Sequence, residues 1–277
     1  AIGSYSGALS SIEPSELAGS VMQVAVERSG VDPHAINYVT VGNCIPTEAR
    51  YPYVARVASI QAGLSMDSVA MAVNRLCSSG LQGIVTSAQQ IMLGDCDYAI
   101  GGGVEVMSRG LYGSPAMRTG ARMGDTKLID MMVSALTDPF GVGHMGITAE
   151  NIVDKHNISR EAQDAFAYES QQKAIAAVDS GRFNDEIVPI EIKTRKGVIV
   201  FDKDEYPNRS TTPEILAKLR PAFKKDGSVT AGNSSGINDG ASFVIVASEE
   251  MVDKYNLPVL AEIVAIGQAA LDPNYMG

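Results

Sequence analysis

The residues in this chain that could supply a nucleophile are its cysteines, and Cys77 has the most favourable position. It follows the short apolar run at residues 69–73 and precedes Gly80, after which apolar residues recur at three- and four-residue steps. The run predicts a strand buried on both faces, and the recurrence predicts an amphipathic helix. Because free N–H groups and the positive dipole end at a helix start favour a thiolate over a thiol, we predict that Cys77 is a nucleophile.

A structural role remains the alternative, because cysteine is among the most often buried residues and usually acts as a small hydrophobe. For Cys44, after a strand-like stretch, and Cys96, in the turn at residues 94–97, the sequence shows no activating partner and predicts structural roles. No two cysteines form a CxxC pair, so we expect neither a metal site nor a redox dithiol. Their odd, sparse number fits a reducing compartment, and we expect a cytoplasmic location.

Length, composition and charge limit the class of protein. The chain has 277 residues, of which 45% are hydrophobic and 19% charged, enough for one large domain or two smaller ones. It shows neither a bilayer-length apolar stretch nor a signal-peptide pattern, and its net charge of −10 argues against binding nucleic acid or anionic membranes. Basic residues nevertheless gather between Arg209 and Lys225, which indicates either a solvated helix face or an anion site.

The order of the expected elements is that of an α/β protein. Before residue 104 we expect helices over residues 14–28, 53–62 and after Gly80, and strands over residues 36–41, 69–73 and 98–103. Strands that alternate with helices predict right-handed crossovers and a parallel-dominated sheet covered by helices on both faces. In such sheets the reactive crevice lies at the carboxyl ends of the strands, where Cys77 is expected.

After residue 103 the composition of the sequence and its pattern of expected elements change. Glycine, methionine, arginine and proline punctuate residues 107–124, and a helix over residues 161–177 and strands over residues 187–193 and 198–201 are expected before the basic segment. We interpret residues 1–103 as an amino-terminal core carrying the nucleophile, 104–231 as an inserted loop domain with binding loops, and 232–259 as the return of the core. The return contains an expected strand over residues 242–247. A strand over residues 260–267 would begin a further unit at 260–277.

Four ordered segments then resemble one family. They read NRLCSSGLQ at residues 74–82, GGGVEVMS at 101–108, GHMGITAEN at 143–151 and TAGNSSGINDGA at 230–241. These segments resemble the nucleophile loop, the glycine-rich strand, the pantetheine-binding loop and the segment closing over the CoA tail of thiolases. That family comprises acetyl-CoA acetyltransferases and 3-ketoacyl-CoA thiolases, and the resemblance runs along essentially the whole chain. It implies the thiolase-like fold and a homodimer or homotetramer.

The resemblance also implies a chemistry. Cys77 would take the acyl group as a thioester, with its own backbone N–H helping to hold the oxyanion. The reaction would be Claisen condensation of acyl-CoA, such as two acetyl-CoA giving acetoacetyl-CoA, or the reverse thiolysis of 3-ketoacyl-CoA; direction and acyl length stay open. Coenzyme A would be substrate and product, with no other cofactor. The residues implied to bind CoA, with Arg209 at its nucleotide end, are Leu136, His144, Met145, Arg209, Phe223, Ala231, Ser235 and Gly236.

Taken singly, these residues have ordinary interpretations. His144 could be a loop histidine, Met145 a core filler and Ser235 a turn residue, and Glu105 is expected to be a buried acid with no chemical role. The CoA interpretation of these residues depends on the family pattern, which also favours the anion site in the basic segment because CoA carries phosphates.

One departure from the family pattern leaves two hypotheses open. The family's second half carries Asn-Glu-Ala-Phe, a histidine in Gly-His-Pro and a second cysteine, and none of these is among the 277 residues. We therefore expect the amino-terminal part of an active thiolase, clipped also at its start. The alternative is a non-catalytic CoA- or lipid-binding module. The intact Cys77 loop favours the enzyme, because a pure binder needs no thiol at a helix start.

Overall fold

The computed structural model describes residues 1–276. Its main sheet has five strands in the order β1-β9-β4-β2-β3. In its parallel half, β2 (Tyr38–Gly42) lies between β3 (Val69–Val73) and β4 (Tyr98–Val106). On the other side, β9 (Asn238–Ala247) runs antiparallel to both β4 and the short β1 (Gly3–Ser4). The α/β class is as expected, and the returning strand β9 makes the sheet mixed.

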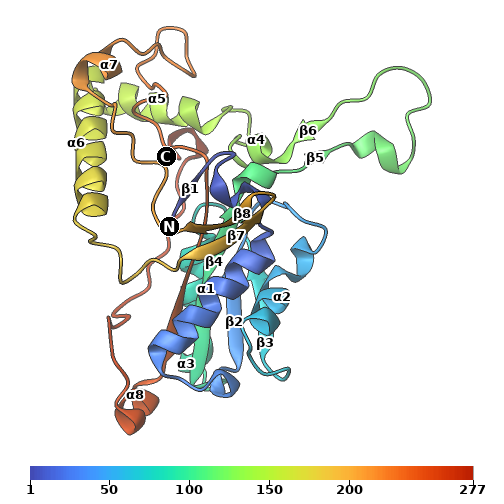
Figure 1. The fold of residues 1–277 in the computed structure, drawn as a ribbon. Helices are drawn as coiled ribbons and strands as arrows, with labels where there is room; N and C mark the ends of the chain where they lie inside the picture. Colours follow the sequence, from blue (N-terminus) through green and yellow to red (C-terminus); the bar gives the residue numbers. More distant parts are fainter. Residues whose placement is uncertain (277) are drawn as a thin grey trace.

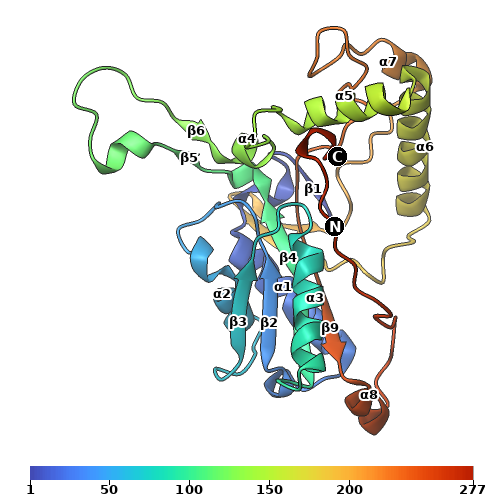
Figure 2. The same ribbon diagram turned by 180° about the vertical axis from the view of Figure 1, so that it is seen from behind.

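Helices cover both faces of this sheet, as expected. Helices α1 (Pro14–Ser29) and α2 (Val54–Gln61) pack together on one face, and α3 (Ser79–Met92) lies alone on the other (Figures 1 and 2). Helix α1 begins at the expected proline and ends at Gly30, whose φ of 71° is the left-handed conformation that glycine accepts at a helix end. The main core lies between α1, α2 and the sheet and includes Leu17, Met22, Val39, Val41, Val54 and Ile100.

The expectation that residues 69–73 are buried on both faces is wrong. Among the described residues, strand β3 pairs only with β2, so it forms an edge of the sheet, and the side chain of Val69 is 55% exposed. A continuous apolar run indicates a strand, but it does not tell an interior strand from an edge strand.

Glycines bring α3 unusually close to β4. A Cβ atom on Gly83 would lie 2.6 Å from the carbonyl oxygen of Gly102, and one on Gly101 would lie 2.6 Å from the Cα of Ile84. Side chains at these positions would push the helix away from the strand. Contact with α3 explains the glycine at position 101 and seats the start of α3 against the carboxyl end of the sheet, whereas a side chain on Gly102 would meet Ser242 and Phe243 of β9.

Most of the chain between β4 and β9 lies beyond one end of the sheet, whereas residues 190–201 pack against the main core through Ile190, Ile192 and Phe201. Helices α5, α6 and α7 lie together there, and the loop between β5 and β6 extends away from the rest (Figure 1). The elements are β5 (Tyr112–Gly113), β6 (Ile129–Asp130), α4 (Met131–Ala135), α5 (Met145–His156), α6 (Arg160–Asp179), β7 (Ile190–Thr194), β8 (Gly197–Phe201) and α7 (Pro213–Ala217). The expected helix over 161–177 and both expected strands are present, whereas α5 replaces an expected loop.

Short elements complete the fold. Helix α8 (Glu249–Tyr255) follows β9. The 3₁₀ helices span Ala8–Ser11, Pro33–Ala35, Tyr51–Tyr53, Met107–Arg109, Pro115–Arg118 and Pro273–Tyr275. Within residues 1–276, no helix combines the length and the apolar character that crossing a bilayer requires.

The expected strand over residues 260–267 is absent. This segment is irregular, and the side chains of Leu260 and Val264 are 99% and 86% exposed. A strand needs a hydrogen-bonded neighbour, and among the described residues this segment pairs with none. Farther on, Asn274 accepts a hydrogen bond from Asn151 of α5 at 2.9 Å through its backbone oxygen. The domain limits expected from the sequence stay a prediction.

Candidate active site

Cys77 lies where the sequence placed it, between β3 and α3. We call residues 74–79 the nucleophile turn. The Cys77 side chain is exposed, and α3 begins two residues later. The turn therefore presents a free thiol to solvent at the start of a helix, which is the geometry expected of a nucleophile.

The backbone of the nucleophile turn is strained at Leu76. Its φ of 49° is in the left-handed region, which a branched side chain rarely adopts. Three hydrogen bonds oppose the strain: Leu76 N donates to Asn74 Oδ1 at 3.0 Å, and Leu76 O accepts from Ser79 N at 2.9 Å and from Ser79 Oγ at 2.6 Å. Such a conformation persists only where its surroundings hold it, as they do here.

Cys44 also reaches the nucleophile turn. It follows β2, and its thiol donates to Leu76 O at 2.9 Å and lies 3.0 Å from Ser79 Oγ. Burial raises the pKa of Cys44 to about 12, so the group stays a thiol at neutral pH. The sequence predicts a structural role for Cys44, and this contact with the nucleophile turn goes beyond that prediction. The signal was available, because Cys44 follows a strand parallel to β3 and the carboxyl ends of parallel strands meet at one edge.

Glu105 and Gly42 help to fix the contact between the end of β2 and the nucleophile turn. The Glu105 carboxylate accepts hydrogen bonds from the backbone N–H groups of Cys44 and Ile45, and burial raises its pKa. The side chain is half-buried and held by these hydrogen bonds, which agrees with the structural role that the sequence allows for Glu105. A Cβ atom on Gly42 would lie 2.3 Å from the carbonyl carbon of Ser79, so only glycine lets the end of β2 touch the turn.

Cys96 lies at the opposite end of α3 from the nucleophile turn. It is half-buried, and burial, followed by the charges of Asp95 and Asp97, raises its pKa. Its surroundings therefore disfavour the thiolate, in agreement with the expected structural role.

Four of the predicted CoA-binding residues come together at the start of α5. His144 caps this helix, with its Nδ1 accepting a hydrogen bond from Gly146 N at 3.1 Å. Its ring stacks on Phe223, with centroids 4.9 Å apart and planes 13° apart. Met145 N donates to Leu136 O at 2.8 Å. The arrangement forms an aromatic and apolar cluster, which we call the stacked cluster: Leu136, His144, Met145 and Phe223.

Two of the other predicted CoA-binding residues line a pocket of about 340 Å³, and Ser235 and Gly236 adjoin its lining. Arg209 and Ala231 line it together with Tyr206, and a Cβ atom on Gly236 would lie 2.3 Å from the Tyr206 ring. Ser235, beside the lining residue Ser234, is exposed. The structure thus divides the predicted residues between the stacked cluster and this pocket.

The basic segment is partly neutralised. The Arg209 guanidinium forms two hydrogen bonds to the Asp179 carboxylate, at 2.9 and 2.5 Å, and Lys224 pairs with Asp154 at 2.8 Å. A phosphate bound by Arg209 would have to share it with Asp179. The role of Arg209 at the nucleotide end of CoA stays a prediction.

Residues 221–236, which we call the clamped segment, carry Phe223 and Ala231 and are fixed to α5 by Glu150. The segment doubles back on itself, with Ala222 N donating to Val229 O at 2.9 Å. The Glu150 side chain is only 1% exposed, and it accepts hydrogen bonds from Ser228 N at 2.9 Å and Val229 N at 2.8 Å. Two backbone donors of the segment thereby find their acceptor on α5.

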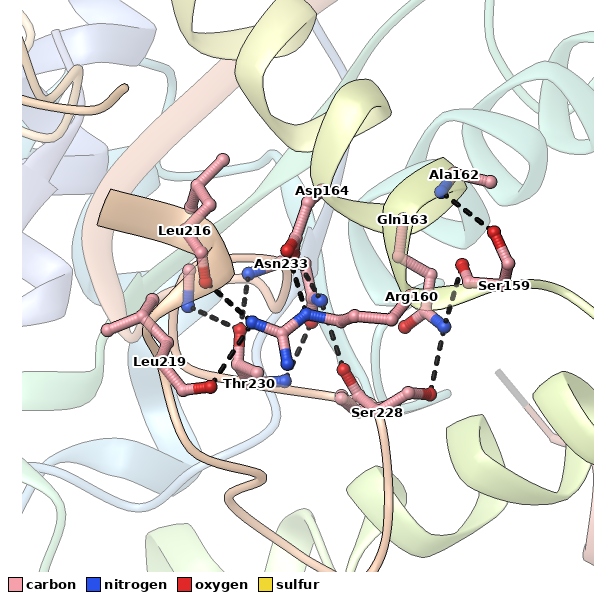
Figure 3. Close-up of polar contacts among 12 residues, drawn as sticks. Ser159, Arg160, Ala162, Gln163, Asp164, Leu216, Leu219, Ser228, Thr230 and Asn233 are labelled. Atoms are coloured by element: carbon pink, nitrogen blue, oxygen red, sulfur yellow. Dashed lines mark hydrogen bonds and ion pairs between the residues drawn. The ribbon is translucent and has the colours of Figure 1, made fainter. Parts of the chain in front are cut away.

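Helix α6 holds the same segment through a polar network (Figure 3). Asp164 accepts hydrogen bonds from Asn233 Nδ2 at 2.9 Å and from Arg160 Nε at 2.8 Å. Asn233 Oδ1 in turn accepts from Thr230 N at 2.7 Å, and Arg160 Nη2 donates to Leu216 O at the end of α7. Glu150 and Asn233 were not among the predicted site residues, although they lie inside the motifs at residues 143–151 and 230–241. Within residues 1–276, no group of three or more His, Cys, Asp or Glu side chains could hold a metal ion.

Comparisons with known proteins agree on one family. The sequence matches the family described as "Thiolase, N-terminal domain" over residues 1–250. The whole chain is 48% identical to a beta-ketothiolase of Cupriavidus necator and 47% identical to an acetyl-CoA acetyltransferase of Pseudomonas aeruginosa, and it spans 71% of each. A Bacillus anthracis acetyl-CoA acetyltransferase structure superposes with a TM-score of 0.95 at 44% identity, over 99% of this chain and 69% of that one. The structure of human mitochondrial 3-ketoacyl-CoA thiolase in complex with CoA superposes with a TM-score of 0.88 at 40% identity, over 93% of this chain and 64% of that one.

Proposed function

This chain belongs to the thiolase family of acyltransferases, and we propose that Cys77 is the residue that accepts the acyl group. The observation that carries the proposal is the exposed thiol of Cys77 in a turn held rigidly at the start of α3. The thiolate attacks the carbonyl carbon of an acyl-CoA, the new C–S bond forms, and the CoA thiolate leaves. The backbone N–H of Cys77 faces the developing oxyanion in this proposal.

Coenzyme A is the proposed carrier of the acyl group, as substrate and product, and no other cofactor takes part. The stacked cluster offers the apolar and aromatic surface that a pantetheine arm requires, and a Phe223 ring fixed against His144 loses little entropy on binding. The human relative whose structure contains CoA supports the same substrate class. Arg209 and the neighbouring pocket suit the polar nucleotide end.

The proposed reaction is Claisen condensation of acyl-CoA or the reverse thiolysis of 3-ketoacyl-CoA. Both directions pass through the acyl thioester on Cys77. Of the three histidines, His34 precedes β2 at the opposite end of the sheet, and His156 ends α5. The proposal gives neither a role and keeps His144 for binding CoA.

Mass spectrometry of the protein incubated with acetyl-CoA tests the proposal. We expect an acetyl group on the peptide that contains Cys77, its loss when CoA is added, and no label after Cys77→Ala. Binding of acetyl-CoA without acylation would refute the enzyme proposal and leave the non-catalytic binding module. Acetoacetyl-CoA cleavage with CoA, compared with condensation of acetyl-CoA and measured on the chain extended to the full length of its relatives, then gives the direction.

Alkylation by iodoacetamide provides an independent test of which cysteine reacts. Burial raises the pKa of Cys44 and of Cys96, whereas Cys77 is exposed. We therefore expect Cys77 to be alkylated first, as read by peptide mass spectrometry over time. Faster alkylation of Cys44 or Cys96 would contradict the assignment.

Assembly into a homodimer or homotetramer is part of the same proposal. Its support is the edge strand β3, which offers unpaired backbone groups and the exposed Val69 to a second copy. Light scattering after gel filtration measures the assembly, and Val69→Lys should shift it toward the monomer. The cytoplasmic location stays a prediction from the cysteine content.

A further inference from the structure

We infer that the Cys44 thiol and the Ser79 hydroxyl position Cys77 by jointly holding the carbonyl group of Leu76. The inference rests on the proposed function, since it assigns positioning residues to the proposed nucleophile. Neither side chain is proposed to touch the substrate. Both act on the peptide group that joins Leu76 to Cys77.

Two elements contribute the donors. Ser79 lies in the first turn of α3, and its hydroxyl is 2.6 Å from Leu76 O. Cys44 comes from the loop after β2, and its sulfur is 2.9 Å from the same oxygen. The Ser79 hydroxyl oxygen also accepts a hydrogen bond from Arg75 N at 2.7 Å. One buried hydroxyl thus links the peptide group between Asn74 and Arg75 to the peptide group between Leu76 and Cys77.

The planarity of the peptide bond converts a held carbonyl into a directed N–H. In a trans peptide the C=O of Leu76 and the N–H of Cys77 lie in one plane and point in opposite directions. Because Cys44 and Ser79 draw the carbonyl toward the sheet, the N–H of Cys77 points the other way. That N–H is the proposed oxyanion donor, so its direction bears directly on the rate of acyl transfer.

The turn would not keep this conformation unaided. A left-handed φ at a non-glycine residue is strained, and the hydrogen bonds to Leu76 O offset that strain. Cys44 suits the task because it remains protonated and therefore keeps a hydrogen to donate. Glu105 fixes its backbone, and Gly42 lets Ser79 approach.

Single-turnover acylation of Cys77 by acetyl-CoA tests the inference with matched variants. Ser79→Ala should slow acylation about tenfold or more, and Cys44→Ala by a smaller factor, because misorientation by a fraction of an ångström is costly. Cys44→Ser keeps a donor and should restore most of the rate. The half-saturating acetyl-CoA concentration should stay unchanged in all three, because the predicted CoA-binding residues lie elsewhere.

Ser87→Ala is the structural control. Ser87 is a buried serine on the same helix, and its hydroxyl donates to Ile100 O at 2.9 Å, away from the nucleophile turn. It should lower the melting temperature about as much as Ser79→Ala but leave the acylation rate unchanged. Cys96→Ala is the corresponding control for Cys44→Ala, and it should also leave the acylation rate unchanged.

The outcomes separate the two proposals. If wild-type Cys77 is never acylated, the proposed function fails. If it is acylated and Ser79→Ala matches its rate despite a lower melting temperature, the positioning inference alone fails. Should Ser79→Ala not fold, the comparison of Cys44→Ala with Cys44→Ser decides: equal rates overturn the inference, and a faster Cys44→Ser supports it.

Discussion

The nucleophile turn and the clamped segment are held in place by different means. In the turn, short neutral hydrogen bonds converge on one carbonyl, and glycine contacts leave no room for displacement. In the clamped segment, the carboxylates of Glu150 and Asp164 reach out from two helices to bind backbone and amide groups. The first arrangement fixes the direction of a reacting group, and the second fixes a binding surface. Perturbing the turn should therefore lower the rate, and perturbing the segment should lower affinity.

The largest effect is expected from Gly42→Ala. The new Cβ would lie 2.3 Å from the Ser79 carbonyl carbon and 2.5 Å from Gly80 N, so the start of α3 must move. We expect a loss of stability of about 1–3 kcal/mol, as for overpacked cores, and loss of most Cys77 acylation. Urea unfolding and single-turnover acylation measure the two effects. Gly267→Ala, which meets nothing within 4 Å, is the control and should change neither.

Glu150→Ala should separate binding from rate. It leaves the N–H groups of Ser228 and Val229 buried without their acceptor, which should cost about 2–3 kcal/mol of unfolding free energy. The half-saturating acetyl-CoA concentration should rise, while acylation at saturation stays near the wild-type rate. Asp154→Ala removes only an exposed pair with Lys224 and should cost under about 1 kcal/mol. A lower saturating rate with unchanged affinity would refute the division of roles between the two regions.

A smaller effect is expected in the stacked cluster. His144→Ala and Met145→Ala should each lower kcat/KM by about 1–2 kcal/mol in free-energy terms, the size of one well-made contact. The measurement is steady-state kinetics with acetyl-CoA on this chain extended to the full length of its relatives, together with a melting curve to show that the fold is retained. His156→Ala, at the other end of α5, is the matched control. Wild-type kinetics in both variants would exclude these residues from the binding surface.

The sequence predicted most of the framework and the order of its motifs. The helix that begins at Pro14, the strand before Cys77 and the helix after it all lie where periodicity placed them, and the family resemblance is confirmed. Periodicity failed where the answer depended on neighbours distant in sequence. The same apolar pattern fits an interior strand and the edge strand β3, and residues 260–267 found no strand to pair with.

In the candidate site too, local features could be predicted from the sequence, and contacts between distant residues could not. Cys77 was identified from its local context, because a turn before a helix is a local feature. The contact between Cys44 and Leu76 spans 32 positions and depends on strand order, and the bonds from Asn233 to Asp164 span 69. Local pattern gives no register between such distant segments. The assignments of Leu136, His144, Met145, Arg209, Phe223, Ala231, Ser235 and Gly236 to CoA binding remain predictions.

The smallest expected effect concerns Glu105, which supports the turn through Cys44. Burial raises its pKa above the ordinary value, and the hydrogen bonds from Cys44 and Ile45 oppose this only in part. Between the unfolded and the raised folded pKa, the folded state binds more protons than the unfolded state. The stability that Glu105 contributes is therefore fully present at low pH and is lost as the pH rises through the folded pKa.

Glu105→Gln removes this titration, so the unfolding free energy of wild type minus that of the variant should fall as the pH rises from about 4 to 8. Urea unfolding at several pH values measures the slope. Glu169→Gln is a control of opposite sign, because hydrogen bonding to Lys173 lowers the pKa of Glu169 and its contribution is lost as the pH falls. A difference for Glu105 that is flat, or that rises with pH as for Glu169, would mean that ionisation of this carboxyl costs the folded state nothing. In that case the hydrogen bonds that the carboxyl accepts from the backbone N–H groups of Cys44 and Ile45 would compensate for its burial in full.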